Sequence, residues 1–418
     1  MSRFVIEGGN KLYGNVKIQS AKNCLLPLIS ACIMLESEIT FTNVSMLKDI
    51  TCLLEIIKSL GGSYVYQDGN LKIDCTNLKS YVLPENLVNQ ARAPLFMIGP
   101  LLTRFKKAEF TMPGGCKLGE RPIDIHINGL KKLGVKIEES EIIKCTANKL
   151  TGTTIILSFP SVGATLNLIM SSITAEGITI IKNCAKEPEI VCLCKFLKLV
   201  GAKINGIGTD VIVIDGVKEL KKRKVEFAPI PDRIETGTFL LTVLSTGGEL
   251  TLENVNYSHN ASLIKKIFNN TCKICIFNDR IYIKSSGVGK GLGVVNVLPY
   301  PDFPTDLQSL LLAYSTTLKG QTIVKEHVFK DRFNTAFELN KMGANVKVNG
   351  NVAIVTGVES LHGNFVTATD LRGGAGLILA SLKAQGVSVI DNAEILDRGY
   401  YQIEEKLKNI GANIKRVL

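Results

Sequence analysis

The sequence predicts an α/β protein with two domains, each assembled from three copies of a small unit of helices and strands. Three observations predict this fold class. The chain has 418 residues, which exceeds one ordinary domain. A helix–glycine–strand pattern recurs along its length, and a proline-rich segment interrupts the chain near its middle. Hydrophobic residues make up 45% of the sequence, which is enough for two cores.

The recurring pattern is a helix with an apolar last residue, then glycine, a small residue and a strand, at a period of about 70 residues. Glycine readily adopts the left-handed conformation that ends many helices. The clear copies are Leu60-Gly61-Gly62, Leu133-Gly134-Val135, Val200-Gly201-Ala202, Met342-Gly343-Ala344 and Ile410-Gly411-Ala412. A degraded copy, Thr271-Cys272-Lys273-Ile274, has lost its glycine. Six copies predict two domains of three units each.

The segment Phe227-Ala-Pro-Ile-Pro-Asp232 marks the expected domain boundary, because proline neither continues a helix nor donates to a strand ladder. We expect one domain at residues 22–229 and the other at residues 1–21 together with 230–418. Within the second domain, the alternating stretch from Val346 to Val355 surrounds Asn349-Gly350 and predicts a β-hairpin.

The cysteines and histidines argue against a metal site or a disulfide framework. The eleven cysteines have no regular spacing, and the first residues lack the apolar stretch of a secretory signal. Cys272-Lys-Ile-Cys275 is a lone pair without a second pair at zinc-ribbon spacing, and the four histidines form no pair at helical spacing. We therefore expect reduced thiols, a cytoplasmic location and no metal or other cofactor.

The charge distribution favours small anionic substrates. The formal net charge is +11, but the basic residues are spread along the chain and tryptophan is absent, so no basic-aromatic groove for nucleic acid is predicted. The longest uncharged run, residues 150–175, contains Gly152, Pro160 and Gly163. It reads as strand, turn and buried helix rather than a membrane span. We expect neither nucleic acid nor membrane as a partner.

One loop is predicted to carry a reactive thiol. In Pro113-Gly-Gly-Cys116-Lys117 the glycines relax the backbone, and Arg121 follows shortly afterwards. Nearby cations favour the thiolate form of cysteine. The alternative is a packed, inert cysteine that happens to follow two glycines, and the loop alone leaves the two interpretations even.

Several predicted helices begin beside a cation, where free backbone N–H groups already favour anions. Ser20-Ala-Lys22-Asn23 precedes an apolar helix, and Arg121-Pro122 precedes another with proline in the first turn. Ser161-Val-Gly163 offers a glycine turn suited to phosphate. Further Asp-Arg pairs at predicted helix starts are Asp232-Arg233, Asp331-Arg332, Asp397-Arg398 and the variant Asp370-Leu-Arg372. For any single pair, a capping Asp with a solvated Arg is as good an explanation.

The remaining motifs do not indicate a catalytic or binding site. Gly287-Val-Gly-Lys290 is glycine-rich, but no Ser or Thr follows the lysine, so it is not a phosphate-binding Walker loop. His126 is interpreted as a packed or capping histidine. No G-x-S-x-G turn supports a serine hydrolase.

Seven motifs in one order resemble the enolpyruvyl transferase family, and within it the branch that acts on UDP-N-acetylglucosamine in peptidoglycan synthesis. They are Ser20-Ala-Lys22-Asn23, Pro113-Gly-Gly-Cys116, Gly119-Glu-Arg121-Pro122, Ser161-Val-Gly-Ala-Thr165, Glu187-Pro-Glu189-Ile190, Phe303-Pro-Thr-Asp306 and Asp397-Arg-Gly-Tyr400. The resemblance covers essentially the whole chain and is weakest from His259 to Val294. It implies an inside-out α/β barrel of two domains with three repeats each, the number that the repeats predict.

The resemblance implies transfer of the carboxyvinyl group of phosphoenolpyruvate to the 3'-hydroxyl of UDP-N-acetylglucosamine, through a tetrahedral intermediate. It implies that Cys116 is the proton donor and the site of covalent adducts with phosphoenolpyruvate or fosfomycin, and that Asp306 acts on the sugar hydroxyl. Lys22, Asn23, Arg121 and Arg398 are implied to bind phosphoenolpyruvate. The implied UDP-sugar contacts are Arg92, Arg121, Pro122, Ile123, Asp124, Ile125, Ser161, Val162, Gly163, Asp306 and Val328. Arg332 and Arg372 complete the predicted substrate-binding set.

Three alternatives remain. The sister enzyme that acts on shikimate 3-phosphate has the same fold and chemistry but does not need a thiol in the loop. A catalytically silent UDP-sugar sensor is disfavoured by the presence of Lys22, Cys116, Asp306 and Arg398. A basic nucleic-acid-binding protein is disfavoured by the dispersed charge.

Overall fold

The structure is a computed structural model that describes residues 2–112, 123–267, 272–329 and 332–418. Its described residues divide into two compact units. Unit 1 comprises residues 2–19 and 231–418, and unit 2 comprises residues 20–112 and 123–230. The chain thus begins in unit 1, passes into unit 2 after Gln19 and returns after Ile230.

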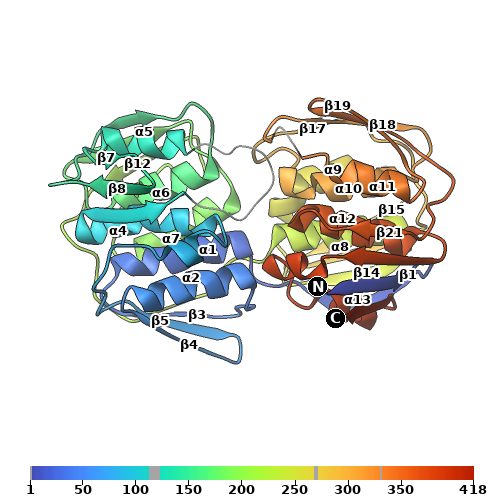
Figure 1. The fold of residues 1–418 in the computed structure, drawn as a ribbon, viewed down its shortest axis with the longest axis horizontal. Coiled ribbons are helices and arrows are strands. Elements are labelled where there is room, and N and C mark those ends of the chain that lie inside the picture. Colours follow the sequence, from blue (N-terminus) through green and yellow to red (C-terminus); the bar gives the residue numbers. More distant parts are fainter. Residues whose placement is uncertain (1, 113–122, 268–271, 330–331) are drawn as a thin grey trace. The chain divides into compact units, whose positions relative to one another are not determined.

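Unit 2 contains three sheets in the part of the chain that the structure describes (Figure 1). The first has the order β13 (Val225–Phe227), β3 (Glu38–Phe41), β5 (Asn70–Asp74), β4 (Ser63–Gln67). The second has the order β11 (Lys203–Asn205), β12 (Val211–Asp215), β10 (Ile178–Lys182), β9 (Thr154–Ile156). The third has the order β6 (Lys107–Thr111), β8 (Ile142–Thr146), β7 (Lys136–Glu138).

Unit 1 also contains three sheets among its described residues. One has the order β21 (Phe365–Thr367), β22 (Val387–Asp391), β1 (Arg3–Glu7), β23 (Asn413–Val417). Another has the order β15 (Cys272–Phe277), β16 (Arg280–Ser285), β14 (Gly248–Glu253), β2 (Leu12–Lys17). The third has the order β17 (Gly293–Val297), β18 (Gln321–Glu326), β20 (Val352–Thr356), β19 (Asn345–Asn349).

The strand pairing follows one rule in all six sheets, which confirms the predicted sixfold repeat. Each four-stranded sheet has one parallel edge pair, such as β17 with β18, followed by two antiparallel pairs, such as β18 with β20 and β20 with β19. The three-stranded sheet keeps the antiparallel part, and an isolated parallel bridge between Val82 and Glu109 stands where the fourth strand would pair. The degraded copy without glycine forms β15, an antiparallel edge strand like β19.

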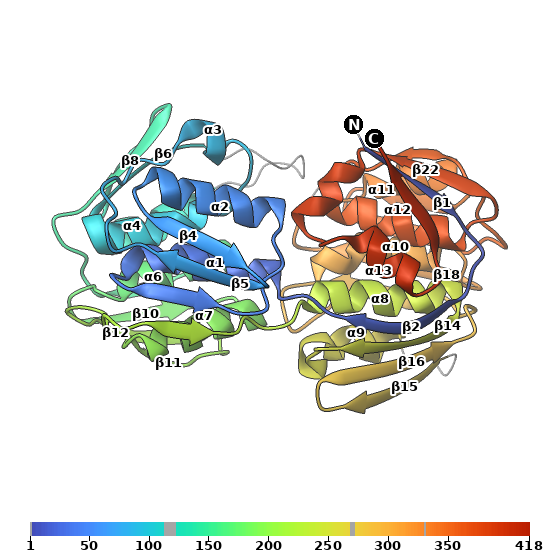
Figure 2. The same ribbon diagram turned by 90° about the horizontal axis from the view of Figure 1, so that it is seen from below.

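Each unit has helices at its centre and sheets at its periphery (Figures 1 and 2). In unit 1 the helices are α8 (Arg233–Thr246), η3 (Tyr257–Asn260), α9 (Ala261–Ile267), η4 (Thr305–Leu307), α10 (Gln308–Ser315), α11 (Thr335–Lys341), α12 (Leu371–Lys383), η5 (Ala393–Arg398) and α13 (Ile403–Asn409). In unit 2 they are α1 (Lys22–Ala31), η1 (Cys32–Met34), α2 (Lys48–Ser59), α3 (Glu85–Val88), η2 (Ala93–Met97), α4 (Ile98–Phe105), α5 (Asp124–Lys132), α6 (Val162–Ser172) and α7 (Pro188–Leu199).

The central helices are buried on every side, and beyond their first turns their sequences are mostly apolar or small, as such burial requires. Every residue of α8 and α10 is buried, and so are all but the two terminal residues of α12. Two hydroxyl groups of α8 are satisfied within the helix, because Thr238 and Thr242 donate to the carbonyls four residues earlier.

The helix-ending glycines adopt the predicted left-handed conformation. Gly61, Gly134, Gly201, Gly343 and Gly411 have φ between +90° and +104°. The hairpin predicted from Val346 to Val355 is formed by β19 and β20.

The described residues contain ten cysteines, all of them free, and eight of these are buried. No helix in the described part of the chain has both the length and the apolar character that crossing a membrane demands. The long uncharged run forms β9 and α6, as predicted.

A second set of glycines allows strands to pass close to neighbouring backbone. A Cβ atom built on Gly357, just after β20, would lie 1.7 Å from the carbonyl oxygen of Leu318. Gly216 holds the equivalent place after β12, and its Cβ would lie 1.7 Å from the carbonyl oxygen of Ala175. Gly357 and Gly216 are required because a side chain would clash with neighbouring backbone. Gly343 is favoured instead because its φ is positive.

This difference predicts unequal costs of substitution. Gly357→Ala should lower the free energy of unfolding by about 3 kcal/mol or more, because backbone must move to relieve the contact. Gly343→Ala, whose Cβ would meet only the His362 ring at 3.6 Å, should cost about 1 kcal/mol through its left-handed conformation. Denaturant unfolding followed by circular dichroism measures both, and equal effects would contradict the distinction.

Candidate functional site

Three buried helices of unit 1 begin beside charged residues. Arg233 is the first residue of α8, Asp306 lies in η4 immediately before α10, and Arg372 is the second residue of α12. The three helices pack against one another in pairs. Asp232 and Asp370 cap α8 and α12 by accepting backbone N–H groups of the first turn. The starts of these helices therefore bring charged side chains of both signs together at one place.

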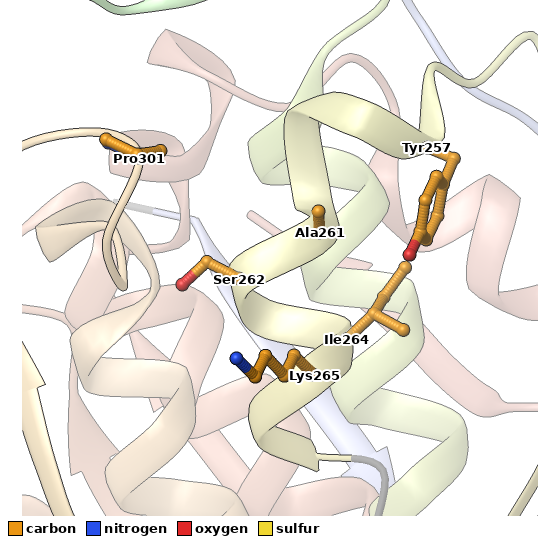
Figure 3. A pocket seen from close by; sticks show the side chains of 6 residues that line it. All are labelled: Tyr257, Ala261, Ser262, Ile264, Lys265 and Pro301. Atoms are coloured by element: carbon orange, nitrogen blue, oxygen red, sulfur yellow. The ribbon is translucent and has the colours of Figure 1, made fainter.

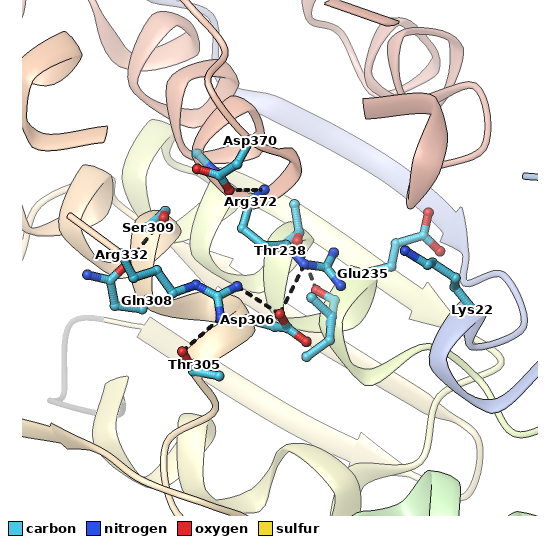
Figure 4. Close-up of polar contacts among 12 residues, drawn as sticks. Lys22, Glu235, Thr238, Thr305, Asp306, Gln308, Ser309, Arg332, Asp370 and Arg372 are labelled. Carbon is cyan, nitrogen blue, oxygen red and sulfur yellow. Dashed lines mark hydrogen bonds and ion pairs between the residues drawn. The ribbon is translucent and has the colours of Figure 1, made fainter. Parts of the chain in front are cut away.

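Asp306 is held by arginines from two directions (Figure 4). Its Oδ1 atom lies 2.8 Å from Nη2 of Arg332 and 3.4 Å from Nε of Arg372. The side chains of Arg332 and Arg372 are 2% and 7% exposed, whereas that of Asp306 is 26% exposed. The carboxylate is thus the accessible member of a largely buried ion cluster.

The electrostatics of this cluster favour an anion. Burial would raise the pKa of Asp306, but the charges of Arg372, Arg332 and Arg233 outweigh it and hold that pKa well below its ordinary value. Burial opposes the charge of Arg372, yet Asp306 raises the pKa of that guanidinium. Three guanidinium groups act on the accessible carboxylate of Asp306, while the carboxylates of Asp232 and Asp370 accept the backbone N–H groups of the helices that they cap.

A second carboxylate shapes the surroundings of Asp306. Glu326, at the end of β18, accepts the hydroxyl of Thr305 at 2.9 Å and the backbone N–H of Val328 at 2.8 Å. Thr305 in turn accepts a hydrogen bond from Arg332 at 2.9 Å. Burial raises the pKa of Glu326. Glu326 therefore ties the predicted contact Val328 to the segment that carries Asp306.

Two of the predicted Asp-Arg helix starts are wrong. Asp397 and Arg398 end the 3-10 helix η5, and the next helix, α13, begins only at Ile403. The carboxylate of Asp397 accepts from the side chain of Arg416 instead of capping a helix. Arg332 precedes α11, which begins at Thr335, and it binds Asp306; its neighbour Asp331 lies outside the described residues.

Lys22 of unit 2 is the first residue of α1, as predicted, and Asn23 follows it. The Nζ atom of Lys22 lies 2.6 Å from Oδ2 of Asp49, in the first turn of α2. The two side chains are 11% and 7% exposed. An ion pair this enclosed depends on the geometry of both partners, so Asp49 fixes the position of the Lys22 ammonium.

The other predicted residues of unit 2 gather around His126 of α5. Arg92 precedes η2, which packs against both α1 and α6, and Ser161 caps α6 by accepting the N–H of Ala164. A Cβ atom on Gly163 would lie 3.1 Å from the His126 ring, so only glycine fits there without displacing it.

His126 is a packed histidine, as predicted. Asn167 lies 3.0 Å from its Nδ1 atom and also binds the backbone of Leu95 and Gly99. Burial and the charge of Arg92 lower the pKa of His126 to about 4, although Asp124 opposes them. The imidazole is therefore neutral at physiological pH, and its ring packs against Gly163.

The remaining predicted residues divide between described and undescribed parts of the chain. Ile123, Asp124 and Ile125 form the start of α5. Cys116, Arg121 and Pro122 lie outside the described residues. Sequence reasoning missed Asp49 and Glu326 as parts of the site, because their partners lie 27 and 21 residues away and no local pattern marks them.

A separate open cavity lies beside α9 in unit 1 (Figure 3). Its volume is about 500 Å³, and it is lined by Tyr257, Ala261, Ser262, Ile264, Lys265 and Pro301. None of the predicted site residues lines it. A search of the described residues finds no group of three or more His, Cys, Asp or Glu side chains arranged to hold a metal ion.

Helix starts that carry buried arginine and lysine side chains, on a fold of six α/β repeats, are suited to binding small anions. A sequence model of the family described as EPSP synthase (3-phosphoshikimate 1-carboxyvinyltransferase) matches residues 6–407. Proteins named UDP-N-acetylglucosamine 1-carboxyvinyltransferase 2, from Caldanaerobacter subterraneus subsp. tengcongensis and Carboxydothermus hydrogenoformans, are 42% and 44% identical and are matched over the full length of both chains. The chain therefore belongs to the enolpyruvyl transferase family, among the UDP-N-acetylglucosamine 1-carboxyvinyltransferases.

Solved structures share the fold. The enolpyruvyl transferase NikO from Streptomyces tendae superposes with a TM-score of 0.89 at 23% identity, over 100% of this chain and 99% of that one. An EPSP synthase from Acinetobacter baumannii superposes with a TM-score of 0.80 at 18% identity, over 100% of both chains. The inside-out α/β architecture expected from the sequence is confirmed.

The cluster around Asp306 predicts a pH-dependent contribution to stability. Because its folded-state pKa is lowered, the carboxylate stabilises the fold above its unfolded-state pKa of roughly 4, and this stabilisation is lost as the pH falls below that value. Asp306→Asn should therefore lower the free energy of unfolding by about 3 kcal/mol at pH 7, since it leaves two buried arginines facing each other. The difference from wild type should shrink as the pH falls below about 4.

The matched control is Asp391→Asn, which breaks the exposed pair between Arg3 and Asp391. It should change the melting temperature little at any pH. A deficit of Asp306→Asn that grew on acidification would contradict the assigned direction of the pKa shift.

Proposed function

We propose that the protein transfers the carboxyvinyl group of phosphoenolpyruvate to the 3'-hydroxyl of UDP-N-acetylglucosamine and releases phosphate. This is the first committed step in the synthesis of peptidoglycan precursors. The observation that carries the proposal is the Asp306 carboxylate among Arg233, Arg332 and Arg372, in a chain similar over its full length to proteins of that name. Both substrates are polyanions, which suits the guanidinium groups of the cluster.

The proposed reaction is an addition followed by an elimination. A proton is added to the methylene carbon of phosphoenolpyruvate while the sugar oxygen bonds to the adjacent carbon and loses its own proton. The tetrahedral intermediate then breaks its carbon–oxygen bond to phosphate, and the methyl group returns one proton to restore the double bond. Positive charge develops on the central carbon between negative groups, so the protein must supply fixed cations, an acid and a base.

The predicted residues take these roles. Lys22, Asn23, Arg121 and Arg398 bind phosphoenolpyruvate, and Cys116 delivers the proton to its methylene carbon. Asp306 accepts the hydroxyl proton of the sugar. The UDP-sugar contacts are Arg92, Arg121, Pro122, Ile123, Asp124, Ile125, Ser161, Val162, Gly163 and Val328, with Arg332 and Arg372 binding anionic groups of the substrates.

The lowered pKa of Asp306 implies that substrate binding also changes the basicity of this carboxylate. A carboxylate held by three arginines is a weak base, because a proton would have to displace those charges. Anionic substrate groups that pair with Arg332 and Arg372 would offset the same charges and raise the basicity of Asp306. Proton abstraction would then start only after the anionic substrates are bound, so Asp306 would not act as a base in their absence.

The experiment that tests the function is phosphate release from phosphoenolpyruvate by the purified protein. We expect release with UDP-N-acetylglucosamine and none with shikimate 3-phosphate as acceptor. The reverse result would retain the chemistry and reassign the substrate to the sister reaction, which the description of the matching family model favours. UDP-sugar binding without phosphate release from either acceptor would favour a silent sensor.

The role of Cys116 predicts sensitivity to fosfomycin, an epoxide that alkylates thiolates. Wild-type protein should lose activity on incubation with fosfomycin and gain one covalently bound molecule, as measured by intact mass spectrometry. Cys116→Asp should keep a carboxylic acid as proton donor and should resist the drug, because a carboxylate is a poor nucleophile.

The control for this test is Cys275→Ser, which removes a partly exposed thiol of β15. This variant should be inactivated at the wild-type rate. Equal inactivation of Cys116→Asp and wild type would contradict the assignment of Cys116 as the reactive thiol.

We further place the protein in the cytoplasm, where phosphoenolpyruvate and UDP-sugars are made. We also propose that phosphoenolpyruvate itself forms an adduct with Cys116.

A further inference from the structure

The segment Asp397–Tyr401 carries Arg398, and four of its five residues are held by side chains or backbone from elsewhere in unit 1. These contacts come from the last strand, from the residue before the crossover into unit 2, and from two central helices. None of the residues that make them was predicted as part of the site, apart from Arg372.

Arg416, on the last strand β23, holds the start of the segment. Its Nη1 and Nη2 atoms donate to the two carboxylate oxygens of Asp397 at 3.0 and 2.7 Å. Its Nε atom donates to Glu404 at 2.7 Å, and its guanidinium lies 4.7 Å from the centre of the Phe4 ring. A planar guanidinium bound on three sides leaves Asp397 little freedom.

Gln19 holds the other end of the segment. Its buried side-chain amide donates to the carbonyl of Gly399 at 3.0 Å and accepts the N–H of Tyr401 at 3.0 Å. Its backbone is fixed in turn, because its N–H donates to Glu235 at 2.7 Å and its carbonyl accepts from the N–H of Asp232 at 2.9 Å.

Glu235 is itself buried and accepts from Lys406 at 2.6 Å, so the anchor of Gln19 belongs to a connected polar network. Tyr400, between the two atoms that Gln19 binds, points into the unit. Its hydroxyl lies 2.9 Å from the Thr238 hydroxyl of α8, and the Arg372 guanidinium lies 5.6 Å from its ring centre. The side chain of the residue before Arg398 and the backbone of the residue after it are thus both held.

We propose that Gln19 and Arg416 are positioning residues that hold Arg398 ready to bind phosphoenolpyruvate. This inference rests on the proposed function. Arginine side chains lose considerable rotamer freedom when they bind an anion, and a segment already held on both sides of Arg398 reduces the further entropy that must be lost. Neither Gln19 nor Arg416 needs to touch substrate for this effect.

The test compares the two substrates in the same protein. Gln19→Met keeps the volume of the side chain and removes both of its hydrogen bonds, and Arg416→Met removes the contacts to Asp397. Each variant should raise the KM for phosphoenolpyruvate about tenfold, as loss of preorganisation in an anion clamp does. The KM for UDP-N-acetylglucosamine should stay within about twofold of wild type. Gln19→Glu can still accept from Tyr401 but places a buried carboxylate oxygen against the carbonyl of Gly399, so it should raise this KM at least as much as Gln19→Met.

The control variants break equivalent contacts elsewhere in unit 1. Asn340→Leu removes an amide that binds the backbone of Val346 twice, at 2.9 Å each, as Gln19 binds the segment. Arg3→Met removes an arginine–carboxylate pair from the same sheet as Arg416. Both should leave both KM values unchanged.

The outcomes separate the two proposals. Absence of phosphate release by wild-type protein would overturn the proposed function and this inference with it. An active wild type with unchanged KM for phosphoenolpyruvate in Gln19→Met and Arg416→Met would overturn the inference alone. Equal loss for both substrates, paralleled by a lower melting temperature and by the control variants, would also overturn it, since that result reports general destabilisation. If one variant does not fold, the other decides.

Discussion

The structure depends on burying whole helices, their first turns included. A helix start has N–H groups without partners inside the helix, so a buried start needs caps or anions. In unit 1, Asp232 and Asp370 cap two such starts, and Asp306 stands before the third. Arginines act on Asp306, which is the accessible member of the cluster. The same burial that stabilises the core therefore requires charged side chains of both signs at the helix starts.

The repeated fold could be predicted because its signal is local. Each helix that ends in a left-handed glycine carries that glycine in sequence, and Gly61 and Gly411 keep the same geometry at opposite ends of the chain. The degraded copy at β15 shows that the strand survives without the signal. Gly216 and Gly357 are also equivalent positions, but the reason for glycine there is a carbonyl from a distant loop. No periodic pattern reveals such an approach.

Site residues could be predicted from the sequence only where the charged residue itself belongs to a recognisable motif. Asp306, Lys22 and Arg372 were predicted from motifs and helix starts, and the structure places each at such a start. Asp397 looked like a helix cap, yet its partner Arg416 lies 19 residues away on a strand. Gln19 contacts Gly399 across 380 residues. Residues such as Gln19 and Arg416 support the site through contacts with residues that are distant in sequence. Their role therefore becomes visible only in the folded structure.

The path of the chain through unit 1 has a consequence for the order of events during biosynthesis. Strand β1 lies between β22 and β23, so residues 3–7 pair with residues 387–391 and 413–417. The described residues of unit 2 all lie between Ser20 and Ile230, so this unit can form its core while unit 1 is still incomplete. Strand β1 must wait unpaired until β22 and β23 have been synthesised. The unit that contains Asp306 and Arg398 therefore closes this sheet later than unit 2 forms its core.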